Sequence, residues 1–199
     1  MKNTKKVLIL ILIIVLCVIS ILYFKGKGKK TNDMNDVTNI LKEIKSYTSD
    51  VDIEIVNDKQ TLKYKIKQTY SKNEIYKIRL ENNRVLSYEK GNIYVDDIEN
   101  NRKYVINENL DSVFKLTFIE KYIKLLYTNE NIKYNYKDVN GKKYVAVTLD
   151  LPGMNKNLSK GVLYIENKTQ YPSKLIIYDE NNKERIRITY KNLKVNILK

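Results

Sequence analysis

The sequence predicts a mainly β protein with a few helices: a curved, antiparallel, half-open β-barrel of about 11 strands, preceded by one transmembrane helix. Apolar and polar residues alternate along most of the chain from Val51 onward, which is typical of strands with one wet face. Turn sequences such as Asn140-Gly141 separate these strands, so neighbours should pair as hairpins. A flat sheet of this length leaves exposed edges, and we therefore expect it to curl.

The transmembrane helix is predicted by an apolar run from Val7 to Phe24, 18 residues without a charge. A helix of that length spans ~27 Å, close to the thickness of a hydrocarbon core. A cleaved signal peptide should end in small residues, but the only alanine in the chain is Ala146. Residues 1–30 are therefore interpreted as a signal anchor with its basic flank, and a cleaved signal peptide is the weaker alternative. Residues 31–199 form the predicted folded domain.

The orientation of this anchor is not decided by charge, because lysines flank both of its ends. We expect the usual arrangement of N-terminal anchors: a single-pass protein of the cell membrane, with its domain on the extracytoplasmic side.

The net charge of +14 raises the question of nucleic-acid binding. Seven of these charges are lysines within the first 30 residues, which leaves about +7 for the rest of the chain. The remaining lysines are spread among acidic residues and form neither a basic helix face nor a Gly-rich RNA motif. Nucleic-acid binding is therefore not expected, whereas attraction to anionic headgroups or wall polymers stays open.

Two helical segments are expected to cover the concave face of the sheet. The first runs from Met34 to near Tyr47, where apolar residues recur at helical spacing. The second lies between Leu110 and Tyr127 and interrupts the strands. Its apolar stripe fits plain core packing or the lining of a lid over a concavity, and the residues concerned are Phe114, Leu116, Phe118, Ile119 and Ile123.

The residues for most catalytic chemistry are missing from the sequence. There is no histidine, which excludes Ser-His-Asp and Cys-His systems and most zinc sites. No phosphate loop, dinucleotide fingerprint or EF-hand spacing occurs. We therefore expect no enzyme activity, no catalytic residue, no metal and no cofactor. The 17 tyrosines, many in predicted strands, suit either sheet packing or an amphipathic cavity or protein interface.

Three stretches of the chain carry a resemblance to a known family. They are TLKYKIKQTYSKNEIYKIRLENN (61–83), SVFKLTFIEKYIKLL (112–126) and YPSKLIIYDENNKERIRITYKNLKVN (171–196). Together with the order of elements, they make residues 36–197 resemble the LolA/LolB-like lipoprotein-sorting proteins, and most of all the GerS-type germination lipoproteins of spore-forming clostridia.

This resemblance implies a fold and two function classes. The fold is a half-open antiparallel barrel with a helical lid over an apolar concavity. GerS-type proteins support a cortex peptidoglycan amidase, which implies a non-enzymatic envelope protein with an N-acetylmuramoyl-L-alanine amidase as its partner in sporulation or germination, at the forespore envelope in spores. LolA-type proteins carry lipoproteins by burying their acyl chains, which implies a lipid or lipoprotein carrier. An anchored lipid sensor is a third option. We favour the amidase-binding protein because a tethered chain cannot shuttle.

The sequence departs from GerS-type proteins at Cys17, the only cysteine. A lipidated cysteine follows a small residue and ends its apolar run, whereas Leu16 precedes Cys17 and apolar sequence continues for seven more residues. We therefore expect Cys17 to be an ordinary apolar residue of the anchor and not a lipidation site.

Overall fold

The computed structural model describes residues 39–197, with positions 74, 82, 112, 129, 130 and 154 excepted. All described residues belong to one compact unit, Met34–Lys199. The predicted anchor, residues 7–24, and Cys17 lie outside the described residues. Across the part of the chain that is described, no helix has both the length and the apolar character needed to cross a membrane.

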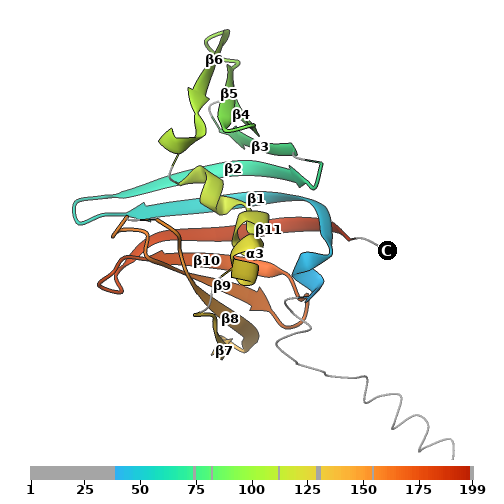
Figure 1. The fold of residues 1–199 in the computed structure, drawn as a ribbon, viewed down its shortest axis with the longest axis vertical. Helices are drawn as coiled ribbons and strands as arrows, with labels where there is room; N and C mark the ends of the chain where they lie inside the picture. Colours follow the sequence, from blue (N-terminus) through green and yellow to red (C-terminus); the bar gives the residue numbers. More distant parts are fainter. Residues whose placement is uncertain are drawn as a thin grey trace, which may run out of the picture. The chain divides into compact units, whose positions relative to one another are not determined.

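The described unit is built around one sheet of eleven strands, as the alternation predicted (Figure 1). In chain order the strands are β1 (Ile44–Val56), β2 (Thr61–Ser71), β3 (Ile75–Leu80), β4 (Arg84–Glu89), β5 (Asn92–Asp97), β6 (Arg102–Asn107), β7 (Lys133–Val139), β8 (Lys142–Asp150), β9 (Lys160–Glu166), β10 (Pro172–Tyr178) and β11 (Glu184–Ile197).

All pairings in this sheet are antiparallel, and its order is β6-β5-β4-β3-β2-β1-β11-β10-β9-β8-β7. Each half of the chain is a meander, and the pairing of β1 with β11 joins the two halves in the middle. The sheet is open, with β6 and β7 as its edges. The prediction of a mainly β fold with about eleven antiparallel strands is confirmed.

Two of the hairpin turns show directly how the sequence fixes the register. Lys90-Gly91 and Asn140-Gly141 each form a two-residue loop, between β4 and β5 and between β7 and β8. All four residues have positive φ angles, between 48° and 79°. Positive φ at both central positions defines the type I′ turn, whose twist matches that of paired strands, and glycine accepts it without steric cost.

The helical insertion between the two meanders consists of three short pieces: η1 (Glu108–Leu110), η2 (Phe114–Thr117) and α3 (Ile119–Thr128). Figure 1 shows α3 lying across the middle strands, in front of β1, β11 and β10. We call η2 and α3 together the lid. The core lies between the lid and the inward side chains of the sheet, and Phe118, Ile119, Ile53, Ile78 and Leu163 are all buried there.

The first predicted helix is wrong in its extent. Of the described residues in the stretch predicted as this helix, only 39–42 are helical, and β1 already begins at Ile44. The cause is a bulge: the register between β1 and β11 shifts between Ile44 and Ser46. An extra residue in one strand changes the phase of the alternation, so Ile44 and Tyr47 both point into the core although they are three residues apart. That spacing imitates a helix in the sequence.

Candidate functional site

The lid is the element on which the sequence placed its candidate site, and its five predicted residues all face the sheet. Phe118, Ile119 and Ile123 are buried, and Phe114 and Leu116 are partly buried and pack against the same core. The Phe118 ring meets Tyr76 and Tyr88 edge to face, with centroids 5.1 and 5.6 Å apart. The space below the lid is thus occupied by the aromatic side chains of the protein itself.

Tyrosine hydroxyl groups of the sheet hold the start of α3. The backbone N–H of Ile119 donates to Tyr47 Oη at 2.9 Å, and Tyr190 Oη donates to the carbonyl of Thr117 at 2.9 Å. Gln68, from β2, donates through Nε2 to Thr117 Oγ1 at 2.7 Å. Strands β1, β2 and β11 therefore fix this one point of the lid from below.

A tyrosine of α3 itself makes the corresponding contact toward the other half of the sheet. Tyr122 Oη donates to the carbonyl of Gly161 at 2.5 Å and lies 3.2 Å from the carbonyl of Val147. Both carbonyls belong to adjacent strands, β9 and β8, and Tyr122 is buried.

An acidic residue of α3 provides another attachment. Tyr76 Oη donates to Glu120 Oε2 at 2.7 Å, and Lys124 Nζ, one helical turn further on, lies 2.6 Å from Glu120 Oε1. Lys121 lies over the Tyr76 ring, 4.9 Å from its centroid. Glu120 is almost fully buried, so these partners supply the compensation that a buried carboxylate requires.

Asp111 organises the loop that enters the lid. Its carboxylate accepts the backbone N–H groups of Val113, Phe114 and Lys115 at 2.7–3.0 Å, and the Tyr88 hydroxyl at 2.6 Å. It therefore accepts the free backbone N–H groups at the start of η2 and ties this short helix to β4 at the same time.

The environment of these tyrosines shifts their ionisation. Burial is the main cause that raises the pKa of Tyr47, Tyr88, Tyr122 and Tyr190 far above the usual value for tyrosine. Burial, followed by the nearby Glu120 charge, raises the pKa of Tyr70 to about 12. The hydroxyl groups below the lid therefore stay protonated at any physiological pH and remain hydrogen-bond donors.

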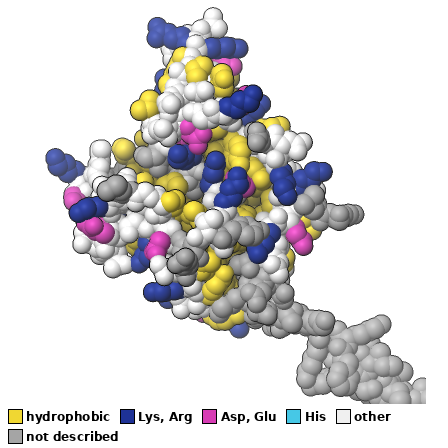
Figure 2. Space-filling view, viewed as in Figure 1, with side chains coloured by type: hydrophobic (Ala, Val, Ile, Leu, Met, Phe, Trp, Pro, Cys, Tyr) yellow, Lys and Arg dark blue, Asp and Glu magenta, His cyan; other side chains and the backbone are white. Residues whose placement is uncertain are grey.

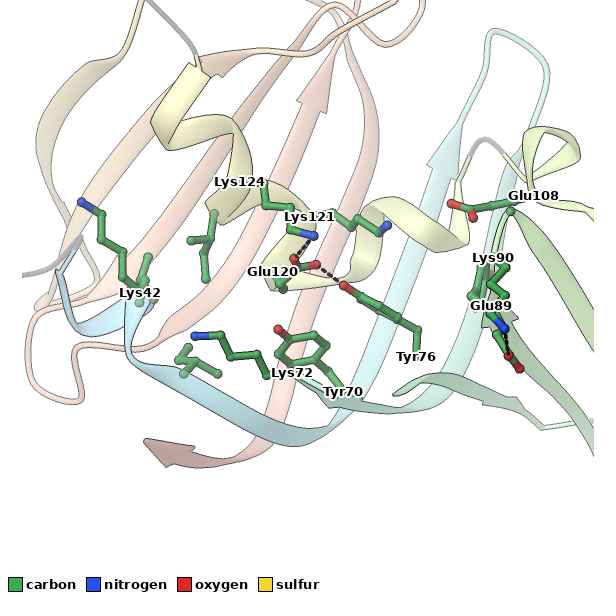
Figure 3. Close-up of a pocket in the computed structure, with 15 residues that line it drawn as sticks. Lys42, Tyr70, Lys72, Tyr76, Glu89, Lys90, Glu108, Glu120, Lys121 and Lys124 are labelled. Carbon is green, nitrogen blue, oxygen red and sulfur yellow. Dashed lines mark hydrogen bonds and ion pairs between the residues drawn. The ribbon is translucent and has the colours of Figure 1, made fainter. Parts of the chain in front are cut away.

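A cleft of about 590 Å³ opens beside the lid, between α3, strands β2–β4 and the start of β1 (Figure 3). Its walls include the aromatic rings of Tyr70, Tyr76 and Tyr88. Figure 3 shows the Tyr70 and Tyr76 hydroxyls turned toward Glu120. We call this space the tyrosine cleft.

The tyrosine cleft is cationic at its rim. Three glutamates line it, together with the five lysines Lys42, Lys72, Lys90, Lys121 and Lys124. Glu120 is paired with Lys124, and Glu89 Oε1 lies 3.7 Å from Lys90 Nζ. Since the other three lysines face only one further glutamate of the lining, positive charge prevails at the opening. Figure 2 shows Lys and Arg side chains grouped with hydrophobic ones over the middle of this face.

A second cleft, of about 430 Å³, opens on the other side of the lid. Leu116 and Leu125 from the lid, Leu175 and Ile177 from β10, and the segment around Leu158 give it apolar walls, and Lys115 and Lys121 reach its rim. We call it the apolar cleft. Lys121 and Glu108 border both clefts, so the lid surface connects them.

Sequence reasoning placed the lid correctly but missed the tyrosine contacts that hold it. Strand alternation could have assigned Tyr70, Tyr88 and Tyr190 to the inward face, because each sits in phase with buried aliphatic residues. The hydroxyls of Tyr88 and Tyr190 bind Asp111 and Thr117, which lie 23 and 73 residues away in the chain, and no local pattern encodes these partners.

Similar structures have been solved. The GerS lipoprotein in its complex with the CwlD amidase from Clostridioides difficile matches with a TM-score of 0.51 and 22% identity, over 85% of this chain and 98% of that chain. An uncharacterised conserved protein from Thermus thermophilus matches with a TM-score of 0.51 and 8% identity, over 86% and 90%. A LolA-superfamily protein from Nitrosomonas europaea matches with a TM-score of 0.40 and 11% identity, over 83% and 94%. The resemblance to GerS expected from the sequence is confirmed.

Among sequences, no curated protein matches this chain. The sequence model of the YdcC-like sporulation proteins, however, matches residues 4–198. Since this match spans nearly the whole chain, the chain belongs to the YdcC-like family of sporulation proteins.

Proposed function

We propose that this protein is a non-enzymatic, membrane-anchored envelope protein of sporulating cells that binds a cell-wall amidase of the N-acetylmuramoyl-L-alanine class and supports its activity in sporulation or germination. The observation that carries the proposal is the attachment of the lid: tyrosine hydroxyls tie it to both halves of the sheet above a filled core.

The attached lid favours a binding platform over a carrier. A carrier must open its lid to admit acyl chains. Here, opening would break several buried hydrogen bonds, each with a net value of about 0.5–1.5 kcal/mol, and would expose Phe118 and Ile119. A lid that stays closed instead presents a surface of fixed shape, which lowers the entropy cost of binding a protein.

The composition of the lid face suits a protein partner. Tyrosine is enriched in the energetically dominant parts of interfaces, and the tyrosine cleft offers the rings of Tyr70, Tyr76 and Tyr88 to an incoming side chain. Its lysine rim would attract an acidic partner surface and raise the association rate. We propose this cleft as the partner's contact site.

The biological setting of the proposal comes from the relatives. The family is one of sporulation proteins, and GerS, of similar fold, is bound to the amidase CwlD. We propose that the apolar run at residues 7–24 anchors the chain as a single-pass protein with its domain outside the cytoplasm, at the forespore envelope in spores.

The proposal can be tested with the full chain in mild detergent and a purified cell-wall amidase of the same organism. We expect a stable complex by size-exclusion chromatography. The double variant Lys72→Glu/Lys121→Glu should weaken it at least tenfold, because two rim cations become anions. Lys133→Glu/Lys168→Glu, with the same charge change on exposed residues away from the clefts, should bind normally. If no complex forms, or if both variants bind equally, the proposed partner or the proposed site is wrong.

The lipid carrier remains a second candidate because of one observation, the apolar cleft. Its leucine walls and lysine rim would suit an acyl chain with an anionic headgroup. Native mass spectrometry of the protein purified from its membrane tests this candidate. A lipid of defined mass that Leu125→Lys removes would support the carrier, and a lipid-free protein would argue against it.

A further inference from the structure

The face of the sheet opposite the lid carries a compact group of cations on β2 and β3. Along these strands Ile66, Gln68, Tyr70 and Ile78 are buried toward the lid. Because side chains alternate between the two faces, Lys65, Lys67, Lys77 and Arg79 point outward, and all four are exposed. We call these four residues the β2–β3 cation block.

The arrangement of this block is unfavourable for the isolated protein. Lys67 and Arg79 are direct partners in the antiparallel register, and like charges in that position repel. Lys65 and Lys77 extend the positive charge two residues along each strand. Within the described part of the chain, none of the four has a carboxylate within ion-pairing distance.

Acidic residues are present next to the block but have other partners. Asp50, Asp52 and Glu54 of β1 stand opposite Lys67, Lys65 and Lys63 in the register. Asp50 accepts a hydrogen bond from Asn192, Asp52 binds Lys191, and Glu54 binds Arg187 as well as Lys63. The acids of β1 therefore compensate Lys65 and Lys67 only in part, and Lys77 and Arg79 have no acid opposite them in either neighbouring strand.

The block continues into an exposed aromatic and apolar surface. Lys77 stands opposite Ser87 of β4, which stands opposite Tyr94 of β5, which in turn stands opposite Val105 of β6. These side chains therefore follow one another across the outer face. Tyr94 is 46% exposed and Val105 is 53% exposed. The acid on this face of β5, Asp96, is itself paired with Lys103 at 3.6 Å. One outer surface therefore combines unpaired cations with an exposed tyrosine.

We propose that this outer face of β2–β5 lies against a membrane and binds the anionic headgroups of its lipids. Each lysine or arginine near an anionic bilayer raises the affinity of a protein for that bilayer about fivefold. Tyrosine favours the headgroup region because its ring is apolar and its hydroxyl is polar. The inference rests on the proposed membrane anchoring, because it assigns the face that the anchored domain turns to the bilayer.

Two observations favour a membrane over an acidic protein as the partner. Neither the tyrosine cleft nor the apolar cleft includes a residue of the block, which forms part of a broad sheet face suited to an extended planar partner. The proposed anchor would also keep the domain near the bilayer, because the nine residues between Phe24 and Met34 can span at most ~35 Å when extended. Docking by the outer face would leave the lid face to the protein partner.

The test uses the full chain reconstituted into liposomes of phosphatidylcholine, with or without phosphatidylglycerol. A water-soluble acetylating reagent labels exposed lysines, and mass spectrometry measures the rate at each position. We expect phosphatidylglycerol to slow the labelling of Lys65, Lys67 and Lys77 severalfold, and high salt to reverse this by screening. The exposed lysines of the far end of the sheet, Lys133, Lys137, Lys142 and Lys168, serve as internal references and should keep their rates.

A pair of variants tests whether the cation block, and not the overall charge of the protein, causes the docking. Lys65→Gln/Lys67→Gln/Lys77→Gln/Arg79→Gln should remove the effect of phosphatidylglycerol on Tyr94, measured by its protection from iodination. The variant in which the four reference lysines are replaced by glutamine should retain it. Both replace exposed side chains, and an unchanged circular dichroism spectrum shows that both are folded.

The proposal is overturned if phosphatidylglycerol leaves the three lysines unchanged, or slows all lysines equally. Protection that appears only when an amidase is added would assign the face to the protein partner instead. Flotation of the chain with pure phosphatidylcholine liposomes tests the anchor alone. A chain that does not float lacks the proposed anchor, whereas a chain that floats but shows no effect of phosphatidylglycerol lacks the proposed docking face.

Discussion

The Tyr122 ring covers Gly161 so closely that a Cβ atom on Gly161 would lie 2.7 Å from Tyr122 Cε2. The Tyr122 hydroxyl also donates to the Gly161 carbonyl. The absence of a side chain at this position of β9 is therefore what allows α3 to approach the sheet.

The first prediction concerns this contact. Gly161→Ala should destabilise the protein by about 1–3 kcal/mol, because a buried and hydrogen-bonded ring must move. Denaturant unfolding measures the change. In a Tyr122→Ala background the same Gly161→Ala substitution should lower the free energy of unfolding far less, since the ring is absent. Equal costs in both backgrounds would show that Tyr122 does not determine the need for glycine.

The second prediction concerns the hydrogen bond between Tyr76 and Glu120. Tyr76→Phe should lower the free energy of unfolding by about 1–2 kcal/mol, because the acceptor is a nearly buried carboxylate. A double-mutant cycle with Glu120→Gln isolates the pair and should give a clear coupling energy. Tyr94→Phe, on the exposed face, serves as control and should change stability by less than about 0.5 kcal/mol. Purely additive single effects would contradict the attachment of the lid through Glu120.

The third prediction concerns alkaline pH. The folded protein holds the pKa of Tyr47, Tyr88, Tyr122 and Tyr190 above the unfolded value of about 10. Their contribution to stability is therefore complete below pH 10 and is lost above it, by about 1.4 kcal/mol per pH unit for each tyrosine. Ultraviolet titration should show these tyrosines ionising together with unfolding. Gradual ionisation in a folded protein would contradict their burial.

The fourth prediction concerns acidic pH and the turn before β11. The Lys183 backbone N–H, and then Arg185, hold the pKa of the buried Asp179 below its usual range. This contribution is present above pH 4 and is lost as the pH falls toward the lowered pKa. Asp179→Asn should reduce stability at neutral pH and make the acid transition less steep. Glu180→Gln, at an exposed neighbour, should leave both unchanged.

Local patterns were enough to predict most of the fold. Alternation located the strands, and Asn140-Gly141 located a hairpin, because both are effects of neighbouring residues. The pairing of β1 with β11 could not be predicted in this way, since its partners, such as Ile53 and Ile188, lie far apart in the chain. The bulge at Ile44 gave a helical spacing to a strand, and the first predicted helix was therefore too long.

The candidate site was predictable only in outline. The apolar stripe of the lid identified Phe118, Ile119 and Ile123 as residues that face the sheet. The tyrosine cleft and the cation block depend on the register of distant strands, such as the pairing of Lys67 with Arg79, and they became visible only in three dimensions.

We propose above that a closed lid makes this protein a platform for an amidase. A direct test compares the wild type with a variant whose lid is cross-linked shut, in which Tyr122 and Gly161 are left intact. Asn131, just after the lid, and Asp150 of β8, whose side chains lie 3.2 Å apart, are replaced by cysteines and joined by a short reducible cross-linker of thiols. Binding of the purified amidase is then measured by calorimetry, with Cys17→Ser in both proteins. We expect the cross-linked and the uncross-linked protein to bind the amidase with equal affinity. Loss of binding on cross-linking, with recovery on reduction, would contradict it and would show that the lid must open.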